Sequence, residues 1–316
     1  MLPFEWITRA ADRISTHIVR TPLLFDKDLN IYLKFENKQV TGSFKIRGAI
    51  NKVLSLEPWE REQGLVTASA GNHGQGVALS GKIVGAPVFV FASDHAVQTK
   101  VDAMRDFGAE IRFVDGGYGL AEQTAIKFAS ENNLTFVSPY NDGQIIAGQG
   151  TIGLEITDEI TIDPDFTWVV PVGGGGLISG IGSVIQHHKI SPRLIGVQPE
   201  ASAFTFSLFH NGNQLNVPDL PTLADGLSGQ IQDNSITIPI MKKIIDDIIT
   251  VTENEIEYGI AYSWFKYHEI IEGSAATALA AVITGKISAP SVVIISGGNI
   301  QPEVHAQICQ KYAGKL

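Results

Sequence analysis

The stretch Thr41-Gly42-Ser43-Phe44-Lys45-Ile46-Arg47-Gly48-Ala49 decides how the rest of this sequence is interpreted. It follows an apolar run at residues 31–35 that is typical of a strand, and it precedes residues 49–54, which are typical of a helix. Lys45 therefore lies near the start of a helix, between apolar neighbours. Both features favour the neutral amine, which is a nucleophile towards aldehydes. A lone lysine is more often a solvated surface residue. Whether Lys45 is reactive therefore depends on the other motifs of the chain.

The composition is that of an acidic globular protein. Of its 316 residues 44% are hydrophobic and 18% charged, with a net charge of −10 and a pI of about 5.3. This charge argues against nucleic acid or an anionic membrane surface as a main partner. Cys309 is the single cysteine, which excludes an intrachain disulfide and fits a reducing compartment. We recognise no signal peptide and no membrane-spanning run, so we expect a cytoplasmic protein.

Short apolar runs alternate with helix-like segments along most of the chain. The runs lie at 65–68, 87–91, 110–114, 135–137, 168–172, 194–197 and 292–295. This alternation predicts parallel sheets that are covered by helices on both faces. The polar stretch 211–235 has weak periodicity and is expected to be loop.

Four consecutive glycines follow one of the predicted strands. In Gly173-Gly174-Gly175-Gly176-Leu177, successive backbone N–H groups precede a helix-like segment and can bind a phosphate. The Lys-Ser/Thr of a nucleotide P-loop is absent, and so are the spacing and the later acidic residue of a dinucleotide fingerprint. The stretch therefore indicates a phosphate site of another kind, with a flexible loop as the simpler alternative.

Three further turns stand where open sheets bind ligands. Ser69-Ala70-Gly71-Asn72-His73 exposes backbone N–H groups before a helix, and Ser296 follows the last apolar run, where its hydroxyl can meet a ring nitrogen. Either of the two could equally be a simple turn. Glu272 is more simply explained as a helix cap or a surface charge.

A reactive lysine, a phosphate loop and a serine after the last strand match the aldehyde, the phosphate and the ring nitrogen of pyridoxal phosphate. The sequence resembles the fold-type II pyridoxal-phosphate enzymes over essentially its whole length, and among them the threonine/serine dehydratase and serine racemase branch. The motifs that carry the resemblance occur in the family's order at 43–49, 69–74, 147–151, 173–177, 224–226 and 296–299.

The resemblance implies an α/β fold with two open, mostly parallel twisted sheets flanked by helices, similar to the tryptophan synthase β-subunit. A large domain that binds the cofactor would comprise residues 1–63 and 143–316, and a small mobile domain residues 64–142. Closure of one on the other would exclude water. A homodimer is usual in the family. Because the motifs extend almost to Leu316, we expect a short form without the C-terminal regulatory domain of the biosynthetic threonine dehydratases.

The resemblance also assigns roles to residues. Lys45 would form a Schiff base with pyridoxal 5'-phosphate, Phe44 would pack against its ring, Asn72 would bind the phenolic oxygen and Ser296 the pyridine nitrogen. The backbone N–H groups of Gly173, Gly174, Gly175, Gly176 and Leu177 would bind the phosphate. The substrate carboxylate, an anion favoured at a helix N-terminus, would be held by Ser69 and the backbone of Ala70, Gly71, Asn72 and His73.

A serine at the pyridine nitrogen makes the ring a weaker electron sink than an acidic partner would, which suits elimination better than transamination. We therefore expect an ammonia-lyase that converts L-threonine to 2-oxobutanoate and L-serine to pyruvate. Lys45 would take the Cα proton as general base. The β-hydroxyl would leave with a proton donated, in this family, by the cofactor phosphate.

Two departures separate the sequence from serine racemases. Racemisation needs a second acid on the opposite face of Cα, where racemase-like members have a serine and this sequence has Ala70. We therefore expect at most weak racemase activity. Racemase-like members also bind a divalent cation through an acidic cluster, but the corresponding stretch 198–204 contains only Glu200. One carboxylate is too few for such a cation, and we predict no metal site.

Other activities remain open at this point. The elimination could act on another β-hydroxy amino acid, such as hydroxyaspartate or phenylserine, because the wall of the substrate pocket cannot be read from the sequence. A β-replacement enzyme of the cysteine-synthase kind fits less well around Lys45 and Ser296. A non-catalytic sensor of a phosphorylated ligand belongs to a different class. The intact Lys45 argues against it, and a colourless purified protein would favour it.

Overall fold

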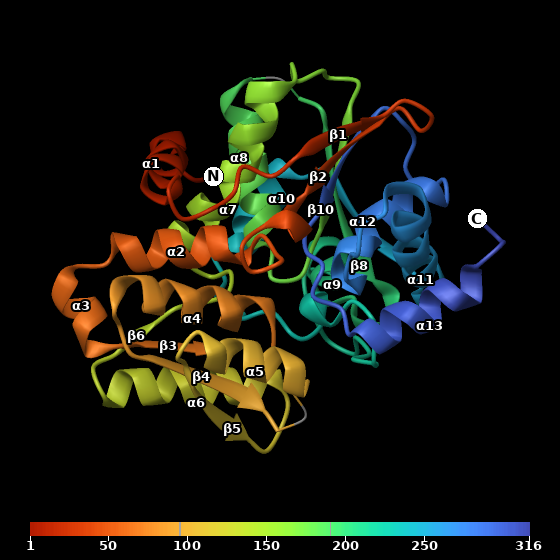
Figure 1. The fold of residues 1–316 in the computed structure, drawn as a ribbon. Coiled ribbons are helices and arrows are strands. Elements are labelled where there is room, and N and C mark those ends of the chain that lie inside the picture. Colours follow the sequence, from red (N-terminus) through yellow and green to blue (C-terminus); the bar gives the residue numbers. More distant parts are fainter. Residues whose placement is uncertain (95, 190) are drawn as a thin grey trace.

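The computed structural model describes residues 1–94, 96–189 and 191–316 and contains two β-sheets, each covered by helices on both faces (Figure 1). The larger sheet has six strands in the order β1-β2-β10-β7-β8-β9, and only β1 and β2 pair antiparallel. The smaller sheet has four parallel strands in the order β5-β4-β3-β6. The predicted fold of two mostly parallel, helix-flanked sheets is confirmed.

The strands are β1 (Leu23–Asp26), β2 (Ile31–Phe35), β3 (Leu65–Ala68), β4 (Val88–Ser93), β5 (Glu110–Val114), β6 (Thr135–Phe136), β7 (Thr167–Pro171), β8 (Arg193–Pro199), β9 (Asp247–Val251) and β10 (Ser291–Ile295). The α-helices are α1 (Phe4–Ile14), α2 (Lys45–Ser55), α3 (Pro58–Gln63), α4 (Asn72–Val84), α5 (Gln98–Asp106), α6 (Tyr118–Glu131), α7 (Gly143–Glu159), α8 (Gly176–His187), α9 (Phe204–Asn211), α10 (Thr237–Ile244), α11 (Glu253–Tyr262), α12 (Gly273–Ile283) and α13 (Pro302–Tyr312). Short turns of 3-10 or π-helix are η1 (Glu36–Lys38), η2 (Glu200–Ser202), η3 (Asp225–Leu227) and η4 (Ser263–Tyr267).

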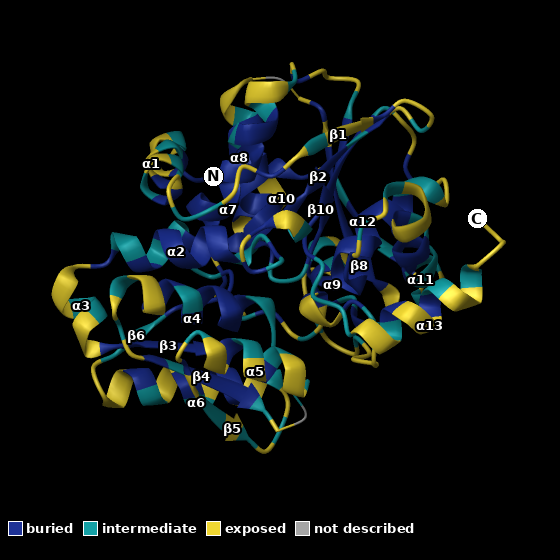
Figure 2. Cartoon of the chain, in the orientation of Figure 1, coloured by how far each residue is buried: buried dark blue, intermediate teal, exposed yellow. Residues whose placement is uncertain are grey.

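The strands of the larger sheet are apolar on both sides because helices cover both faces. In β10, Val292 and Ile294 pack with α1, α7, α8 and α10, whereas Val293 and Ile295 pack with α11, α12 and α13. Successive side chains of a strand point to opposite faces, so a strand covered twice is a continuous apolar run in the sequence. Figure 2 shows this layering, with the central strands and α7 and α8 largely buried and the outer α3 and α13 carrying exposed faces.

Helix α2 connects the smaller sheet to the rest of the molecule. The core between the smaller sheet, α4 and α5 includes Ala49 and Val53 from α2 and Ile145 from α7. The backbones of α2 and α7 approach closely, since a Cβ atom added to Gly148 would lie 2.5 Å from the backbone oxygen of Arg47. This close packing holds the start of α2 against α7, and α2 begins at Lys45 itself.

The structure differs from the sequence expectations in local detail. Helix α2 begins at Lys45, earlier than the apolar pattern predicted. The short helices α3, α9 and α10 were not predicted, because helices of six to eight residues hardly develop a periodic pattern. The stretch 211–235 is loop apart from η3 and the last residue of α9, as expected. Within the described ranges, no helix is long and apolar enough to cross a membrane.

Candidate active site

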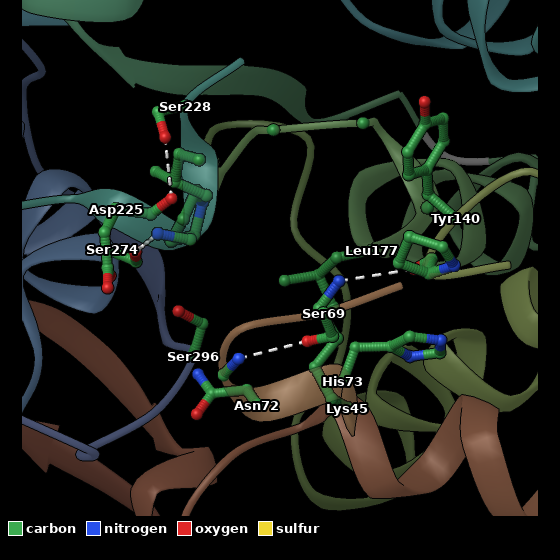
Figure 3. Close-up of a pocket in the computed structure, with 18 of the residues that line it drawn as sticks. Lys45, Ser69, Asn72, His73, Tyr140, Leu177, Asp225, Ser228, Ser274 and Ser296 are labelled. Carbon is green, nitrogen blue, oxygen red and sulfur yellow. Dashed lines mark hydrogen bonds between the residues drawn. The ribbon is translucent and has the colours of Figure 1, made fainter. Parts of the chain in front are cut away.

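A cavity of about 310 Å³ lies at the carboxyl ends of β3, β7 and β10 and at the start of α2. This is the edge at which parallel sheets bind ligands. Every residue that the sequence analysis assigned to cofactor or substrate lines the cavity: Phe44, Lys45, Ser69, Ala70, Gly71, Asn72, His73, Gly173, Gly174, Gly175, Gly176, Leu177 and Ser296. In Figure 3, Lys45, Ser69, Asn72 and His73 gather on one side, across from Asp225 and Ser274. The residues are thus brought together, and their individual roles stay predictions.

The amine of Lys45 has few partners. Its Nζ donates one hydrogen bond of 3.2 Å to the backbone oxygen of Pro139 and lies 5.3 Å from the centre of the Phe44 ring. Burial lowers the pKa of the amine to about 8, although the nearby charge of Glu272 partly opposes the shift. An amine that loses its proton this close to neutral pH can act as a nucleophile and as a general base.

Arg47, two residues further along α2, is surrounded by partners. Its buried guanidinium donates at 2.7 and 2.9 Å to Glu36 and at 2.6 and 3.0 Å to Glu155. Lys34 Nζ donates to the same Glu155 at 2.7 Å. These two cations and two anions join β2, η1, α2 and α7. The network balances its own charge and fixes the helical turn that carries Lys45.

The five residues of the glycine loop at 173–177 line the cavity. The buried hydroxyls of Thr205 and Thr237 donate to the backbone oxygens of Gly173 and Gly174, at 2.6 and 2.7 Å. Among the described residues, no backbone or side-chain group accepts a hydrogen bond from the five N–H groups of this loop. The two threonines were missed by the sequence analysis because neither is near the loop in sequence.

The same loop leaves no room for side chains. A Cβ atom on Gly174 would overlap the ring of Tyr140, and one on Gly176 would lie 3.2 Å from the Cα atom of Tyr140. Gly175 has a φ of +83°, a conformation that side chains disfavour. The loop therefore has the features of an anion cradle at the N-terminus of α8.

The loop at 69–73 leads into the N-terminus of α4 without a charged side chain. Ser69 Oγ accepts a hydrogen bond of 3.1 Å from the Gly71 N–H. His73 Nε2 lies 3.0 Å from the backbone oxygen of Val137, and because a carbonyl can only accept, Nε2 carries the proton. Burial, with the charge of Lys45, lowers the pKa of His73 to about 3, so its ring is neutral. The loop can hold a carboxylate only through N–H groups, a hydroxyl and the helix dipole.

The amide of Asn72 is held in one orientation. Its Nδ2 donates to Glu272 at 2.7 Å, and its Oδ1 accepts from Asn299 Nδ2 at 2.7 Å. Asn299 Nδ2 in turn also donates to the backbone oxygen of Thr41 at 2.8 Å. The second N–H of Asn72 is therefore the polar group left for a ligand. It is a donor, which suits an oxygen such as the phenolic oxygen of pyridoxal phosphate.

The expectation that Glu272 is a cap or a surface charge is wrong. Glu272 occupies the N-cap position of α12 but makes no capping hydrogen bond, and the residue is only 5% exposed. Its carboxyl group lines the cavity, and a Cβ atom on Gly297 would overlap it. Burial, together with the charge of Asp225, raises the pKa of Glu272 to about 7. The sequence signal was weak, because packing against Gly297 and the hydrogen bond from Asn72, both distant in sequence, place this carboxylate in the site.

The lining fits pyridoxal phosphate. The aldehyde would meet the amine of Lys45, and the phosphate would meet the N–H groups of the glycine loop. Ser296 is buried at the cavity wall, and within the described chain its hydroxyl has no protein partner, which leaves it for the ring nitrogen. Among the described residues, no group of three or more His, Cys, Asp or Glu is placed to hold a metal ion.

Known proteins show the same architecture. A family model described as pyridoxal-phosphate dependent enzyme matches residues 14–298. L-Threonine ammonia-lyase of Thermotoga maritima is 38% identical, over 98% of this chain and 79% of its own length. The structure of the processed form of threonine deaminase isoform 2 from Solanum lycopersicum is 29% identical, with a TM-score of 0.87 over 98% of this chain and 93% of its own. Maize serine racemase is 28% identical, with a TM-score of 0.90 over 99% of this chain and 98% of its own. The chain belongs to the family of pyridoxal-phosphate dependent enzymes.

Proposed function

We propose that the protein is an ammonia-lyase that converts L-threonine to 2-oxobutanoate and L-serine to pyruvate, each with release of ammonia. The observation that carries the proposal is the amine of Lys45, whose pKa burial lowers to about 8 in a cavity shared with the glycine loop. The neutral hydroxyl of Ser296 at the same cavity suits elimination. The names of the similar proteins, threonine ammonia-lyase and threonine deaminase, support the same reaction.

Bound pyridoxal phosphate supplies an electron sink for the electrons of the breaking Cα–H bond. The chain supplies the rest. The Ser69 hydroxyl and the N–H groups of the loop at 69–73 that have no acceptor within the described chain, those of Ala70, Asn72 and His73, bind the substrate carboxylate. Asn72 and Ser296 orient the ring, and Lys45 Nζ accepts the Cα proton. The hydroxyl on Cβ then leaves as water with one added proton, which balances the Cα proton that Lys45 Nζ accepted. Water hydrolyses the released enamine to the 2-oxo acid and ammonia, so the reaction needs no oxidant.

The test is release of 2-oxo acid from a panel of β-hydroxy amino acids by the purified, cofactor-loaded protein. We expect L-threonine and L-serine to give the highest kcat/KM. A preference for hydroxyaspartate or phenylserine would support the proposed elimination but show that the substrate is a different β-hydroxy amino acid. A protein that binds the cofactor but releases no 2-oxo acid from any of them would overturn the proposal.

A chiral assay in the same reactions tests the role of Ala70. Its methyl group lies in the loop at 69–73 and cannot transfer a proton. We expect L-serine to be consumed by elimination without appreciable D-serine. Formation of D-serine at a rate comparable to that of pyruvate would contradict this role and favour a racemase.

We also propose that residues 64–142 form a small mobile domain and that the protein is a cytoplasmic homodimer. The four strands of the smaller sheet, which all lie between residues 65 and 136, support the division. The two units meet at the cavity through Asn72 with Glu272 and through Lys100 with Asp225.

Light scattering tests the proposed homodimer, for which we expect a mass of twice the 34.0 kDa of one chain. A mass of 34.0 kDa at micromolar concentration would contradict it.

A further inference from the structure

A second lysine lies at the cavity, beside the loop at 69–73. Lys100 is in the first turn of α5, and its side chain is only 13% exposed. Its Nζ lies 2.6 Å from Oδ2 of Asp225, which belongs to η3 in the unit of the larger sheet. A Cβ atom on Gly71 would lie 3.8 Å from the same Nζ. The ammonium group is therefore next to Gly71, in the loop at which we expect the substrate carboxylate to bind.

The balance of charges that line the cavity indicates that Lys100 interacts with the substrate. In the described part of the lining, the acids are Asp225 and Glu272 and the amines are Lys45 and Lys100, while the ring of His73 is neutral. Lys45 is committed to the cofactor, whose phosphate adds negative charge. The substrate carboxylate adds one more. A helix N-terminus offers only about half a positive charge, so Lys100 is the full positive charge that the described lining leaves for the carboxylate.

We propose that Lys100 is a substrate-binding residue whose ammonium group exchanges the carboxylate of Asp225 for the α-carboxylate of the amino acid. This inference rests on the proposed function, because it takes the loop at 69–73 as the carboxylate site. The side chain of Asp225 is 55% exposed, so after the exchange it returns to water at small cost. Lys100 is largely enclosed and stays in place. Asp225 then acts as a competitor of the substrate and pairs with Lys100 again when the product leaves.

The simpler explanation is an ion pair that only holds the two units together. The two explanations predict different effects of Asp225 on substrate affinity. If the pair only holds the two units together, loss of Lys100 and loss of Asp225 change the affinity for the substrate in the same direction. In the exchange, loss of Lys100 weakens carboxylate binding, whereas loss of Asp225 removes the competitor and strengthens it.

The experiment uses the cofactor-loaded protein and its Lys100→Met and Asp225→Asn variants. The Kd for amino acid comes from the change in visible absorbance on mixing, for L-threonine and for L-threoninamide, which lacks the carboxylate. Lys100→Met should raise the Kd and KM for L-threonine roughly 10- to 100-fold, as expected for loss of a charge-assisted hydrogen bond. Its kcat should stay within about threefold, and its Kd for L-threoninamide within about twofold, because neither depends on that bond. Asp225→Asn should lower the Kd for L-threonine about threefold or more, since it removes one competing ion pair.

Three further variants serve as controls for charge, for folding and for the competition by Asp225. Lys100→Arg keeps the charge and should bind L-threonine within about tenfold of wild type, so it separates charge from folding. Lys82→Met, on the exposed side of α4, should match wild type. The double variant Lys100→Met/Asp225→Asn should behave like Lys100→Met, because without the ammonium group Asp225 has nothing to compete for.

The proposal is overturned if Lys100→Met and Asp225→Asn weaken L-threonine binding alike, or if Lys100→Met weakens L-threoninamide binding as much. It is likewise overturned if Lys100→Met leaves the Kd for L-threonine unchanged. The titration needs no turnover. If these Kd values follow the expected pattern while no 2-oxo acid is released, the proposed reaction fails and the role of Lys100 stands.

Discussion

Lys45 and Arg47 are two residues apart on the first turn of α2, yet their surroundings are opposite: Arg47 is fully buried, whereas Lys45 is half-buried at the cavity. Arg47 has carboxylate partners on two sides, and although burial acts against its charge, Glu36 and Glu155 raise the pKa of its guanidinium. Lys45 has one hydrogen bond to a backbone oxygen, and burial lowers the pKa of its amine to about 8.

The comparison shows how one helical turn serves both stability and reactivity. The Arg47 network satisfies every charge that it buries, which fixes the backbone but leaves no group free to react. Lys45 is left with unsatisfied hydrogen-bonding capacity, which costs stability but keeps its amine available. A rigid network next to a poorly solvated amine is the arrangement expected for a preorganised catalytic group.

The largest expected effect comes from removal of the amine. Lys45→Ala should lower the rate of 2-oxo acid release by about 10³-fold or more, because both cofactor attachment and proton abstraction are lost. Lys52→Ala, which removes another lysine of α2 that pairs with Asp142 at 2.7 Å, should stay within about twofold, because it is far from the reacting atoms. Steady-state assays check both variants. Comparable losses in the two would mean that Lys45 acts only through the fold.

Arg47→Met tests the other half of the comparison. Glu36 loses its charged partner while Lys34 still pairs with Glu155, so one buried negative charge is left uncompensated and the free energy of unfolding should fall by about 3–5 kcal/mol. Arg105→Met, which removes an exposed ion pair with Asp102, should change it by less than about 1 kcal/mol. Urea denaturation of the cofactor-free proteins measures both. Equal, small losses would show that the network does not fix α2.

The lowered pKa of Lys45 predicts how the cofactor-free protein captures pyridoxal phosphate as pH changes. The neutral amine reacts, so the rate should rise with pH, with a midpoint near 8 in place of the ordinary 10.5. Between pH 6 and pH 8 the neutral fraction grows about 50-fold. Stopped-flow absorbance measures the rate. A rate that still rises tenfold per pH unit above pH 9 would mean that the amine is as basic as an exposed lysine.

The smallest expected effect concerns the phosphate loop, because neutral hydrogen bonds, and no ion pair, hold its backbone in place. Thr237→Val keeps the shape of the side chain but removes the hydroxyl that binds the backbone oxygen of Gly174. The Kd for pyridoxal phosphate should rise about three- to tenfold, the value of one neutral hydrogen bond. Thr157→Val, at a partly buried threonine of α7, serves as the control and should bind the cofactor as wild type does. An unchanged Kd in Thr237→Val would mean that the loop needs no such anchor.

The sequence predicted those parts of the site that lie next to an element boundary. Lys45, the glycines at 173–176 and the turn at 69–73 each adjoin a predicted strand or helix, and topology alone brings such positions to one edge. Glu272 and the pair of Lys100 and Asp225 could not be predicted in the same way. Lys100 and Asp225 are 125 positions apart in sequence, and their meeting depends on how two separate sheets face each other. The place of the Glu272 carboxylate depends on its packing beside Gly297 and on its hydrogen bond with Asn72, which is 200 positions away in sequence.

The most direct test of the account is to trap the bond between cofactor and protein. Borohydride reduction of the pyridoxal-phosphate-loaded protein, followed by digestion and mass spectrometry, locates the lysine that carries the cofactor. The account predicts one pyridoxyl group per chain, on the peptide that contains Lys45. A pyridoxyl group on Lys100, or no stoichiometric label at all, would contradict it.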